Sequence, residues 1–328
     1  MVEWKPTATR SMLEHRSAVL THARHFFLDR GLLEVDTPIV VNAPVTDVHI
    51  HSAKVEFAAD SRAFFLHTSP EYAMKRLLAA GSGDIYQICH VVRGLERGRV
   101  HNAEFTLIEW YRIGYTLDQL MHEVETLVRT LLSDVAFSLS SQRLSYQEAF
   151  LQELDLDPFT ASMDELANAA SSVGFTADPQ PGVPRGPGAQ RDELLELLMG
   201  TVIGPKLGRS SLTFIYNYPA SQAALARVNP SDPRTALRFE LYCKGMELAN
   251  GFQELASADE QRARFEHDNE ERRRMGLPTY PLDERLLSAL AAGLPECAGV
   301  ALGFDRTLML AAEVDHIDDV LPFPTDLA

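Results

Sequence analysis

The sequence has few cysteines, and none of them falls in a recognised spacing. Its 328 residues include three, Cys89, Cys243 and Cys297, which lie far apart. Disulfide frameworks and structural zinc sites need several cysteines at short, regular intervals. The sequence therefore predicts neither kind of site, and we expect the three thiols to be small, buried side chains.

Long apolar runs and an excess of basic residues are also missing. No run of about 18 apolar residues occurs, and the first ten residues, MVEWKPTATR, lack the apolar stretch of a signal peptide. The 30 Lys and Arg against 46 Asp and Glu give a net charge of -16. This balance disfavours a protein whose main task is to grip nucleic acid, because phosphate contacts supply most of that affinity. We expect a cytoplasmic protein with no membrane segment and no stable tRNA binding.

Residues 85–112 predict two strands joined by a wide loop. Side chains in a strand alternate between faces, so Phe105, Glu109 and Tyr111 should share one face of the second strand. The loop sequence GLERGRVHN is basic and contains glycine, as suits a loop that holds phosphate. A polar hairpin on an antiparallel sheet can also simply be solvated, so this stretch alone leaves both interpretations open.

A second informative stretch covers residues 238–255. A two-residue turn at 244–245 would place Glu240 and Glu247 on one face, and a bulge at 250–251 would return Glu254 to it. Three carboxylates on one face repel each other unless a cation is present, and magnesium prefers such oxygen ligands. The alternative is that the three glutamates lie on a solvated face.

The remaining patterns predict one domain over residues 1–328 with a helical insertion at about 145–205. The insertion contains a loop rich in Pro and Gly at residues 178–190. Near the end of the chain, a strand of small residues leads into a helix that starts at Asp305. Arg306 in the first turn of that helix opposes the helix dipole, and a nearby anion would account for it.

Three of these stretches resemble the sequence motifs of class II aminoacyl-tRNA synthetases. The segment around Pro38 resembles motif 1, the hairpin with Arg93 resembles motif 2, and GFDR at 303–306 resembles motif 3. Within that class, HTSPE at 67–71, RVHNAEFTLIEWY at 99–111 and ELANGFQEL at 247–255 resemble the catalytic domain of lysyl-tRNA synthetase. The resemblance implies an α+β fold, an antiparallel sheet flanked by helices, and a homodimer formed through motif 1.

Motif 1 begins close to the first residue, so we expect no anticodon-binding domain. YPASQAALA at 218–226, FELYCKGMELANGF at 239–252 and GVALGFDR at 299–306 resemble the stand-alone paralogues of lysyl-tRNA synthetase that modify elongation factor P. This resemblance implies a ligase that uses ATP and Mg²⁺ to activate (R)-β-lysine, and L-lysine less well, as an adenylate. The acceptor would be the ε-amine of a lysine on elongation factor P.

The resemblance also assigns roles to individual residues. Arg93 and Arg306 would be catalytic, with Arg93 on the α-phosphate and substrate carboxylate and Arg306 on the γ-phosphate. Phe105 would stack on adenine, and Glu240 and Glu247 would hold magnesium, Glu247 also contacting ATP. The other residues expected to bind ATP are Gly94, Leu95, Glu96, His101, Asn102, Leu248 and Gly303. Those expected to bind the amino-acid substrate are Ser69, Pro70, Glu71, Glu109, Tyr111, Asn250, Glu254 and Ala301.

Two positions depart from the synthetase pattern. Leu95 stands where motif 2 has a glutamate, with Glu96 directly after it, and Ala301 stands where the synthetases have glycine. The added methyl would narrow the substrate pocket, as a β-amino acid requires.

Other functions remain as alternatives. They are a catalytically reduced regulator or binding module, a free-standing lysine-activating enzyme with another acceptor, and an amide-forming paralogue like asparagine synthetase. The acidic set of Glu109 and Glu254 with Tyr111 disfavours the last, which needs a pocket for aspartate.

Overall fold

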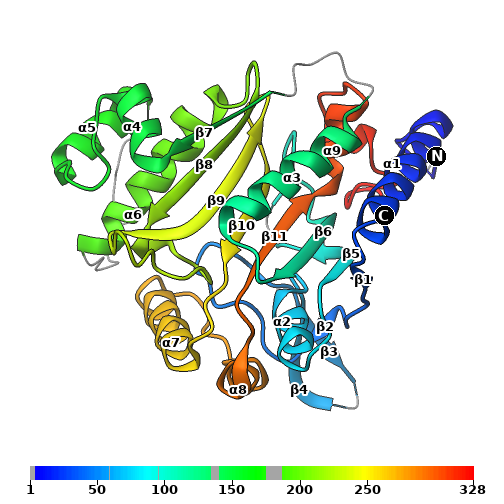
Figure 1. Ribbon diagram of the computed structural model, residues 1–328, viewed down its shortest axis with the longest axis horizontal. Coiled ribbons are helices and arrows are strands. Elements are labelled where there is room, and N and C mark those ends of the chain that lie inside the picture. Colours follow the sequence, from blue (N-terminus) through cyan, green and yellow to red (C-terminus); the bar gives the residue numbers. More distant parts are fainter. Residues whose placement is uncertain (1–3, 59, 95, 134–139, 175–186) are drawn as a thin grey trace. The chain divides into compact units, whose positions relative to one another are not determined.

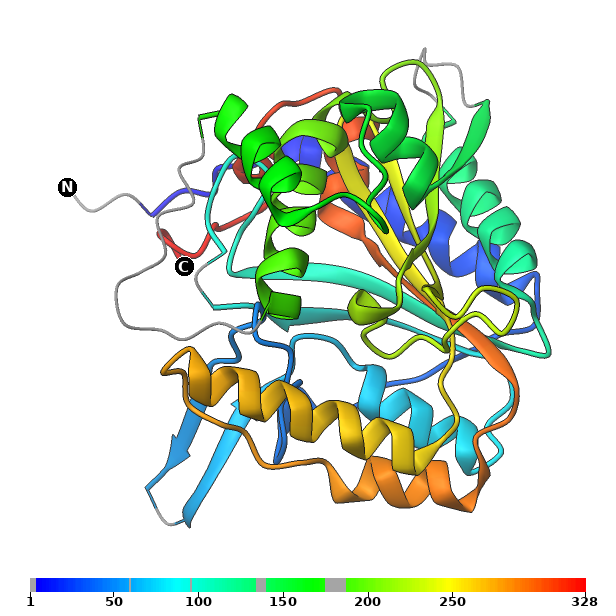
Figure 2. The same cartoon turned by 90° about the vertical axis from the view of Figure 1, so that its left-hand side faces the viewer.

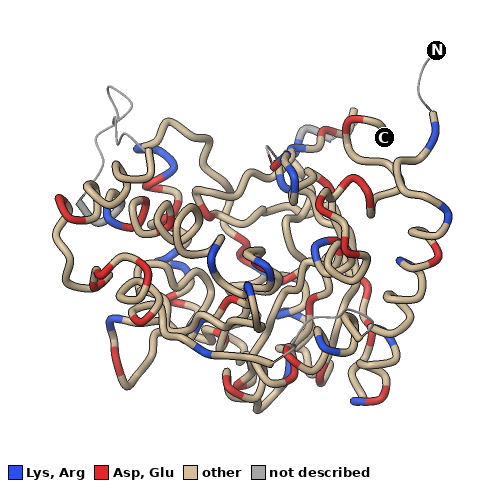
Figure 3. Tube along the Cα trace, turned by 90° about the horizontal axis from the view of Figure 1, so that it is seen from above, with Lys and Arg blue, Asp and Glu red and all other residues tan. Residues whose placement is uncertain are grey.

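The computed structural model describes residues 4–58, 60–94, 96–133, 140–174 and 187–328. Leu95 and most of the predicted loop at 178–190 lie outside these ranges. Within them, no helix combines the length and the apolar character needed to cross a membrane. The chain packs as two compact units, described in turn below: unit 1 is Met1–Ala136, Ala256–Asn269 and Thr279–Ala328, and unit 2 is Phe137–Leu255 and Glu270–Pro278. Lys and Arg are interspersed with Asp and Glu along the trace (Figure 3).

Unit 1 is built on strands in the order β1, β5, β6, β11 (Figure 1). β5 (Ile85–Val92) and β6 (Glu104–Ile113) form the antiparallel hairpin predicted at 85–112, and β11 (Cys297–Gly303) pairs antiparallel with β6. β1 (Leu33–Glu34) pairs in parallel with β5. The hairpin register sets Gln87 opposite Glu109, so the predicted face with Glu109 and Tyr111 is confirmed.

On one face of these strands lie α1 (Arg10–Leu28), α3 (Leu117–Leu131) and α9 (Phe304–Ala311). Thr9 caps α1 and Thr116 caps α3, each accepting a hydrogen bond from an amide of the first turn. Phe27 of α1 stacks on Tyr86 of β5, with ring centroids 4.4 Å apart. Such aromatic pairs stabilise packing beyond their buried area, so they fix α1 to this face.

Against the face of Tyr111 pack α2 (Glu71–Ala79), α8 (Glu284–Gly293) and the part of α7 (Ala258–Arg274) that belongs to unit 1 (Figure 2). Unit 1 also has a small sheet of β2 (Val40–Val41), β4 (Asp60–Leu66) and β3 (Lys54–Phe57), and a 3-10 turn at Ile317–Asp319. The buried side chains that join these helices to the strands are Met74, Leu78, Ile85, Tyr111, Phe265, Leu286, Leu287 and Leu290.

Unit 2 has strands in the order β10, β9, β8, β7. β8 (Leu212–Pro219), β9 (Thr235–Cys243) and β10 (Met246–Gln253) are antiparallel, and β7 (Ser141–Ser145) pairs in parallel with β8. The range of the predicted helical insertion holds α4 (Tyr146–Leu154), α5 (Met163–Ser172) and α6 (Pro187–Leu198), followed by a π-helical turn at Met199–Ile203 and a 3-10 turn at Gly204–Lys206. A further 3-10 turn follows β8 at Ala220–Gln222.

The hairpin of β9 and β10 confirms the predicted turn and corrects the predicted bulge. Lys244 and Gly245 have φ angles of 49° and 77°, the positive values that a two-residue type I′ turn requires. The register shift lies between Glu247 and Ala249, so the prediction of a bulge at 250–251 was wrong. The insertion occurs two residues earlier, and because any single insertion reverses the alternation, Asn250 still lies opposite Glu240.

Candidate active site

Arg93 follows the last residue of β5 and is held from two sides. Its Nε donates to the backbone carbonyl of Thr68 at 3.4 Å, and its guanidinium lies over the ring of Phe105, 5.2 Å from the centroid. The Arg93 amide also donates to the carbonyl of Ala103 at 2.8 Å, which closes the loop at its base. A cation stacked on a ring keeps its in-plane donors for other partners, so this arginine suits the binding of a planar or anionic group.

Arg306 meets the same loop from the first turn of α9. Its Nε donates to the carbonyl of Val100 at 3.2 Å, and its Nη2 lies 2.6 Å from Nε2 of His101. Burial, together with the charges of Arg306 and Arg93, lowers the pKa of His101 to about 4. The imidazole is therefore neutral near pH 7 and accepts the hydrogen bond from Arg306. Two permanent cations beside one neutral histidine make this part of unit 1 suited to phosphate.

Asp305, next to Arg306, is a buried anchor that the sequence reasoning did not assign. It accepts hydrogen bonds from Arg16 of α1 and, at 2.6 Å, from the backbone amide of Thr106 in β6. Arg16 also donates to the Thr106 hydroxyl at 2.8 Å and lies over the ring of Phe304. These bonds fix the start of α9 on β6 and so set the place of Arg306.

Glu109 in the middle of β6 forms the centre of a second cluster. Ser69 donates to Oε2 at 2.6 Å and Tyr111 donates to Oε1 at 2.8 Å, while the glutamate itself is only 2% exposed. Both hydroxyls are neutral, so they orient the carboxylate without changing its charge. Across the ladder from Glu109 stands Ala301 of β11. Burial and the charge of Glu109 raise the pKa of the neighbouring Cys89 thiol to about 12.

Glu71 at the start of α2 is already joined to a cation of the protein. Lys75, one turn on and 1% exposed, donates to Oε1 of Glu71 at 2.7 Å. The amide of Glu71 in turn donates to Oγ of Ser69 at 3.0 Å, and Pro70 occupies the cap position of α2. Sequence reasoning overlooked Lys75, although the spacing of four residues on a helix predicts such a pair.

In unit 2, Glu240 is surrounded by donors. Arg238 donates to Oε1 at 2.6 Å, and the hydroxyls of Tyr218 and Tyr242 each donate to Oε2 at 2.6 Å. The pKa of each tyrosine is raised well above its usual value, mainly by burial and in second place by the charge of Glu240. Both hydroxyls therefore stay protonated as donors. Arg238 was also overlooked, although a residue two positions away in a strand shares the face of Glu240.

Glu247 and Asn250 lie on the same face as Glu240, since the register sets them opposite Tyr242 and Glu240. The Oδ1 atom of Asn250 is buried and has no hydrogen-bond partner among the described residues. Leu248 is the buried extra residue of the bulge. Glu254, just after β10, is buried, and its backbone bridges to Ala226.

The carboxylate oxygens of Glu240 and Glu247 on this face are the kind of ligand that a hard cation such as Mg²⁺ takes. A carboxylate offers about four acceptor positions, and three at Glu240 are filled by Arg238, Tyr218 and Tyr242. Carboxylates that bind metals are commonly held by such outer hydrogen bonds. The described residues contain no group of three or more His, Cys, Asp and Glu that could hold a metal ion. Magnesium on a nucleotide needs only one or two carboxylates, because phosphates and water supply the rest.

The comparison with known families agrees with this geometry. The family model described as tRNA synthetases class II (D, K and N) matches residues 1–327. The chain belongs to this family. The predicted class II catalytic fold is thereby confirmed, and membership implies the use of ATP.

Curated class II relatives match almost end to end. Proteins named elongation factor P–(R)-beta-lysine ligase are 50% identical in Vibrio cholerae serotype O1 over 326 residues and 49% in Vibrio atlanticus over 327, each match covering 98% of both chains. The protein of that name in Proteus mirabilis is 47% identical over 330 residues, 99% of this chain and 98% of its own.

The hairpin that resembles motif 2 contains Arg93, Phe105 and Glu109, and the segment that resembles motif 3 contains Arg306. Four other residues predicted to bind ATP lie in the same segments, namely Gly94, Glu96, Asn102 and Gly303. The Gly94 amide donates to the carbonyl of His51 at 2.7 Å, and Gly303 precedes α9 and accepts from Thr307. Glu96 is half-buried, and the buried amide of Asn102 donates to the carbonyl of Glu104 at 2.7 Å.

Proposed function

We propose that this class II protein is an ATP-dependent ligase that activates (R)-β-lysine, and L-lysine less well, and transfers it to a lysine of elongation factor P. The observation that carries the proposal is the buried carboxylate of Glu109, held by two hydroxyls beside Ala301 on the hairpin that also supplies Arg93. A buried anion of this kind attracts a cationic substrate more strongly than a neutral analogue of the same shape. The names of the relatives that share about half of the residues agree with it.

In the first step the substrate carboxylate attacks the α-phosphorus of ATP. A C–O–P bond forms and the bond to the β-phosphate oxygen breaks, so pyrophosphate leaves and an aminoacyl-adenylate remains. No side chain needs to act as a nucleophile. Arg93 would bind the α-phosphate and the carboxylate, Arg306 the γ-phosphate, and Phe105 the adenine ring, so that catalysis comes from positioning and charge neutralisation.

The second step makes an amide. The ε-amine of the acceptor lysine, once deprotonated, attacks the adenylate carbonyl, and AMP leaves as the C–N bond forms. Glu109 with Ser69 and Tyr111 would hold the distal ammonium of the substrate. Glu71, shared with Lys75, would take the amine nearer the carboxyl end.

Magnesium belongs to the same proposal. When bound it would neutralise phosphate charge. Glu240 and Glu247 would hold it, and Arg238, Tyr218 and Tyr242 keep Glu240 oriented. From the motif 1 resemblance we further propose a homodimer, and from the acceptor a cytoplasmic location.

ATP–pyrophosphate exchange tests the first step, and the intact mass of elongation factor P tests the second. We expect exchange that depends on the amino acid and is stronger with (R)-β-lysine than with L-lysine, and a mass gain of one β-lysyl group when the ligase, ATP and acceptor are combined. An Arg93→Ala variant should abolish both. Absence of exchange with both amino acids would refute the proposed enzymatic activity and favour the alternative of a catalytically reduced regulator or binding module. Exchange with an unchanged mass of elongation factor P would favour a lysine-activating enzyme with another acceptor.

A further inference from the structure

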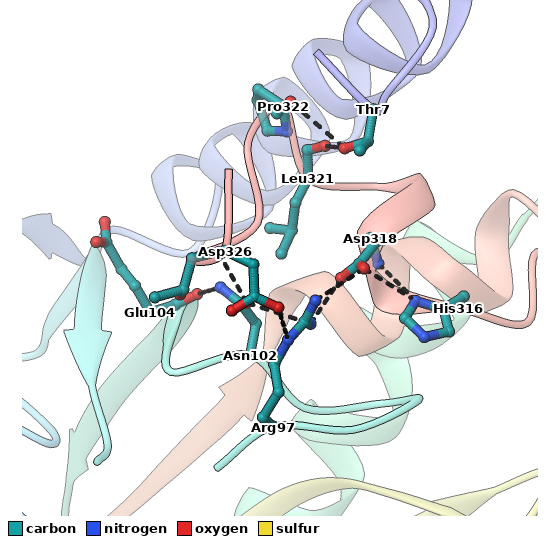
Figure 4. Close-up of polar contacts among 10 residues, drawn as sticks. Thr7, Arg97, Asn102, Glu104, His316, Asp318, Leu321, Pro322 and Asp326 are labelled. Atoms are coloured by element: carbon teal, nitrogen blue, oxygen red, sulfur yellow. Dashed lines mark hydrogen bonds and ion pairs between the residues drawn. The ribbon is translucent and has the colours of Figure 1, made fainter. Parts of the chain in front are cut away.

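The segment near the end of the chain lies against the loop of the motif 2 hairpin (Figure 4). Arg97 of the loop makes a two-pronged ion pair with Asp318, its Nη1 and Nη2 donating at 2.8 and 3.0 Å to the two carboxylate oxygens. Its Nε donates to Asp326 at 3.0 Å. One guanidinium thus joins two carboxylates that lie more than 200 positions away in the sequence.

Backbone groups join the same two segments at further points. The amide of Ile317 donates to the carbonyl of Arg99 at 2.9 Å, and Arg99 donates through Nη1 to the carbonyl of Asp315 at 3.0 Å. Farther along, the amide of Thr325 donates to Oδ1 of Asn102 at 3.1 Å. The loop is therefore attached at residues 97, 99 and 102.

The supporting segment is itself anchored in the core of unit 1. Ile317, Val320 and Leu321 are buried. Thr7, which precedes α1, donates through its hydroxyl to the carbonyl of Leu321 at 2.8 Å and through its amide to that of Pro322 at 3.0 Å. The segment is thus a fixed support and not a loose tail.

The same loop carries the groups that meet Arg306. Gly98 and His101 exchange two backbone hydrogen bonds of 3.1 and 3.2 Å and close a tight turn. Val100 and His101 of this turn accept from Arg306. Because the turn is short and bonded across its base, a shift at residue 97 or 99 is transmitted to His101 and Arg306.

We propose that Arg97 and Asp318 are positioning residues for ATP, which hold the loop of residues 96–103 in the place where His101 and Arg306 receive the phosphates; the role of ATP here rests on the proposed function. The Arg97 and Asp318 side chains are 36% and 25% exposed. Ion pairs this close to solvent contribute little to global stability. A two-pronged arginine–carboxylate pair nevertheless fixes geometry, so its loss should affect ATP binding while leaving the fold intact.

Asp318→Asn tests this role, with Asp319→Asn as the matched control. Asp319 is exposed and carries the same charge one position along. We expect Asp318→Asn to raise the KM for ATP about three- to tenfold, the range of one weakened charged hydrogen bond. The KM for the amino acid and the thermal midpoint should match those of the control. An unchanged KM for ATP, or an equal rise in both KM values with a lower thermal midpoint, would overturn the proposal.

A charge swap provides the rescue experiment. Arg97→Asp alone should weaken ATP binding and speed amide hydrogen exchange in residues 97–103. Adding Asp318→Arg should restore part of the ATP affinity and part of the protection from amide exchange. If neither recovers, the ion pair between residues 97 and 318 does not position the loop.

Two readouts do not depend on the ligase activity. ATP binding by calorimetry and amide exchange can be measured even if the wild-type protein activates no amino acid. That lack of activation would refute the proposed function but not the positioning role. Identical ATP affinity and amide exchange in Asp318→Asn and Asp319→Asn would refute the positioning role of Arg97 and Asp318.

Discussion

Ala301 of β11 lies directly opposite Glu109 of β6 in the antiparallel ladder. Residues in such positions have Cβ atoms about 4.5 to 5.5 Å apart, so the methyl group of Ala301 lies near the Cβ atom of Glu109, whose carboxylate Ser69 and Tyr111 orient. The departure from the glycine of the synthetases therefore falls at the proposed substrate pocket.

Ala301→Gly should shift the preference between the two lysines. Removal of the methyl enlarges the space beside Glu109, so we expect the ratio of kcat/KM for L-lysine over (R)-β-lysine to rise roughly tenfold or more, since one methyl is worth about 1 to 3 kcal/mol in a fitted pocket. Ala298→Gly, a change in the same strand on the other face, is the control. An equal ratio in the two variants would argue against a role for Ala301 in selection.

Glu109→Gln should impair binding of the amino acid far more than binding of ATP. The substitution keeps the shape but removes the buried charge that pairs with the ammonium, a loss of about 2 kcal/mol or more. We expect the KM for lysine substrates to rise at least about thirtyfold. Glu104→Gln, at an exposed position of the same strand, should leave it unchanged. Comparable values in the two variants would contradict the proposed pocket.

Lys75→Met should destabilise the fold, whereas Lys54→Met should not. Both lysines pair with a glutamate at 2.7 Å, but the Lys75 side chain is 1% exposed and that of Lys54 is 56% exposed. Removing one partner of a buried ion pair leaves the charge of the other partner uncompensated, so we expect the free energy of unfolding to fall by about 3 kcal/mol. Urea unfolding of the two variants measures this, and equal midpoints would refute it.

The stability of the protein should depend on pH through His101. Its pKa is lowered to about 4 in the folded state by burial and two arginines, while the unfolded chain titrates near the usual value of about 6.5. Between these values the unfolded state binds more protons, so the contribution is present above pH 6.5 and is lost as the pH falls toward 4. Urea unfolding at pH 5 and 7 should show a smaller difference in His101→Gln than in wild type.

His22→Gln serves as the matched control, because His22 is exposed on α1. It should keep the wild-type difference between pH 5 and 7. If His101→Gln behaves in the same way, the lowered pKa of His101 has no bearing on stability.

Local patterns were enough to place much of the candidate site. The period of two put Glu109 and Tyr111 on one face, and the Lys244 turn brought Glu247 to the face of Glu240, as the structure confirms. The bulge was misplaced by two residues, since an extra residue leaves little local signal. The roles assigned to the site residues stay predictions.

Strand alternation, helix capping and turn chemistry act over a few residues, so the sequence alone determined the motif 2 hairpin, the type I′ turn and the helix that carries Arg306. The partners of those residues depend on which distant segments pack together. Arg97 meets Asp318 across 221 positions, and Arg16 meets Asp305 across 289. No local pattern encodes such pairs, because they form only when the sheet and its helices have packed, and so only the tertiary structure decided what supports the loop of residues 96–103.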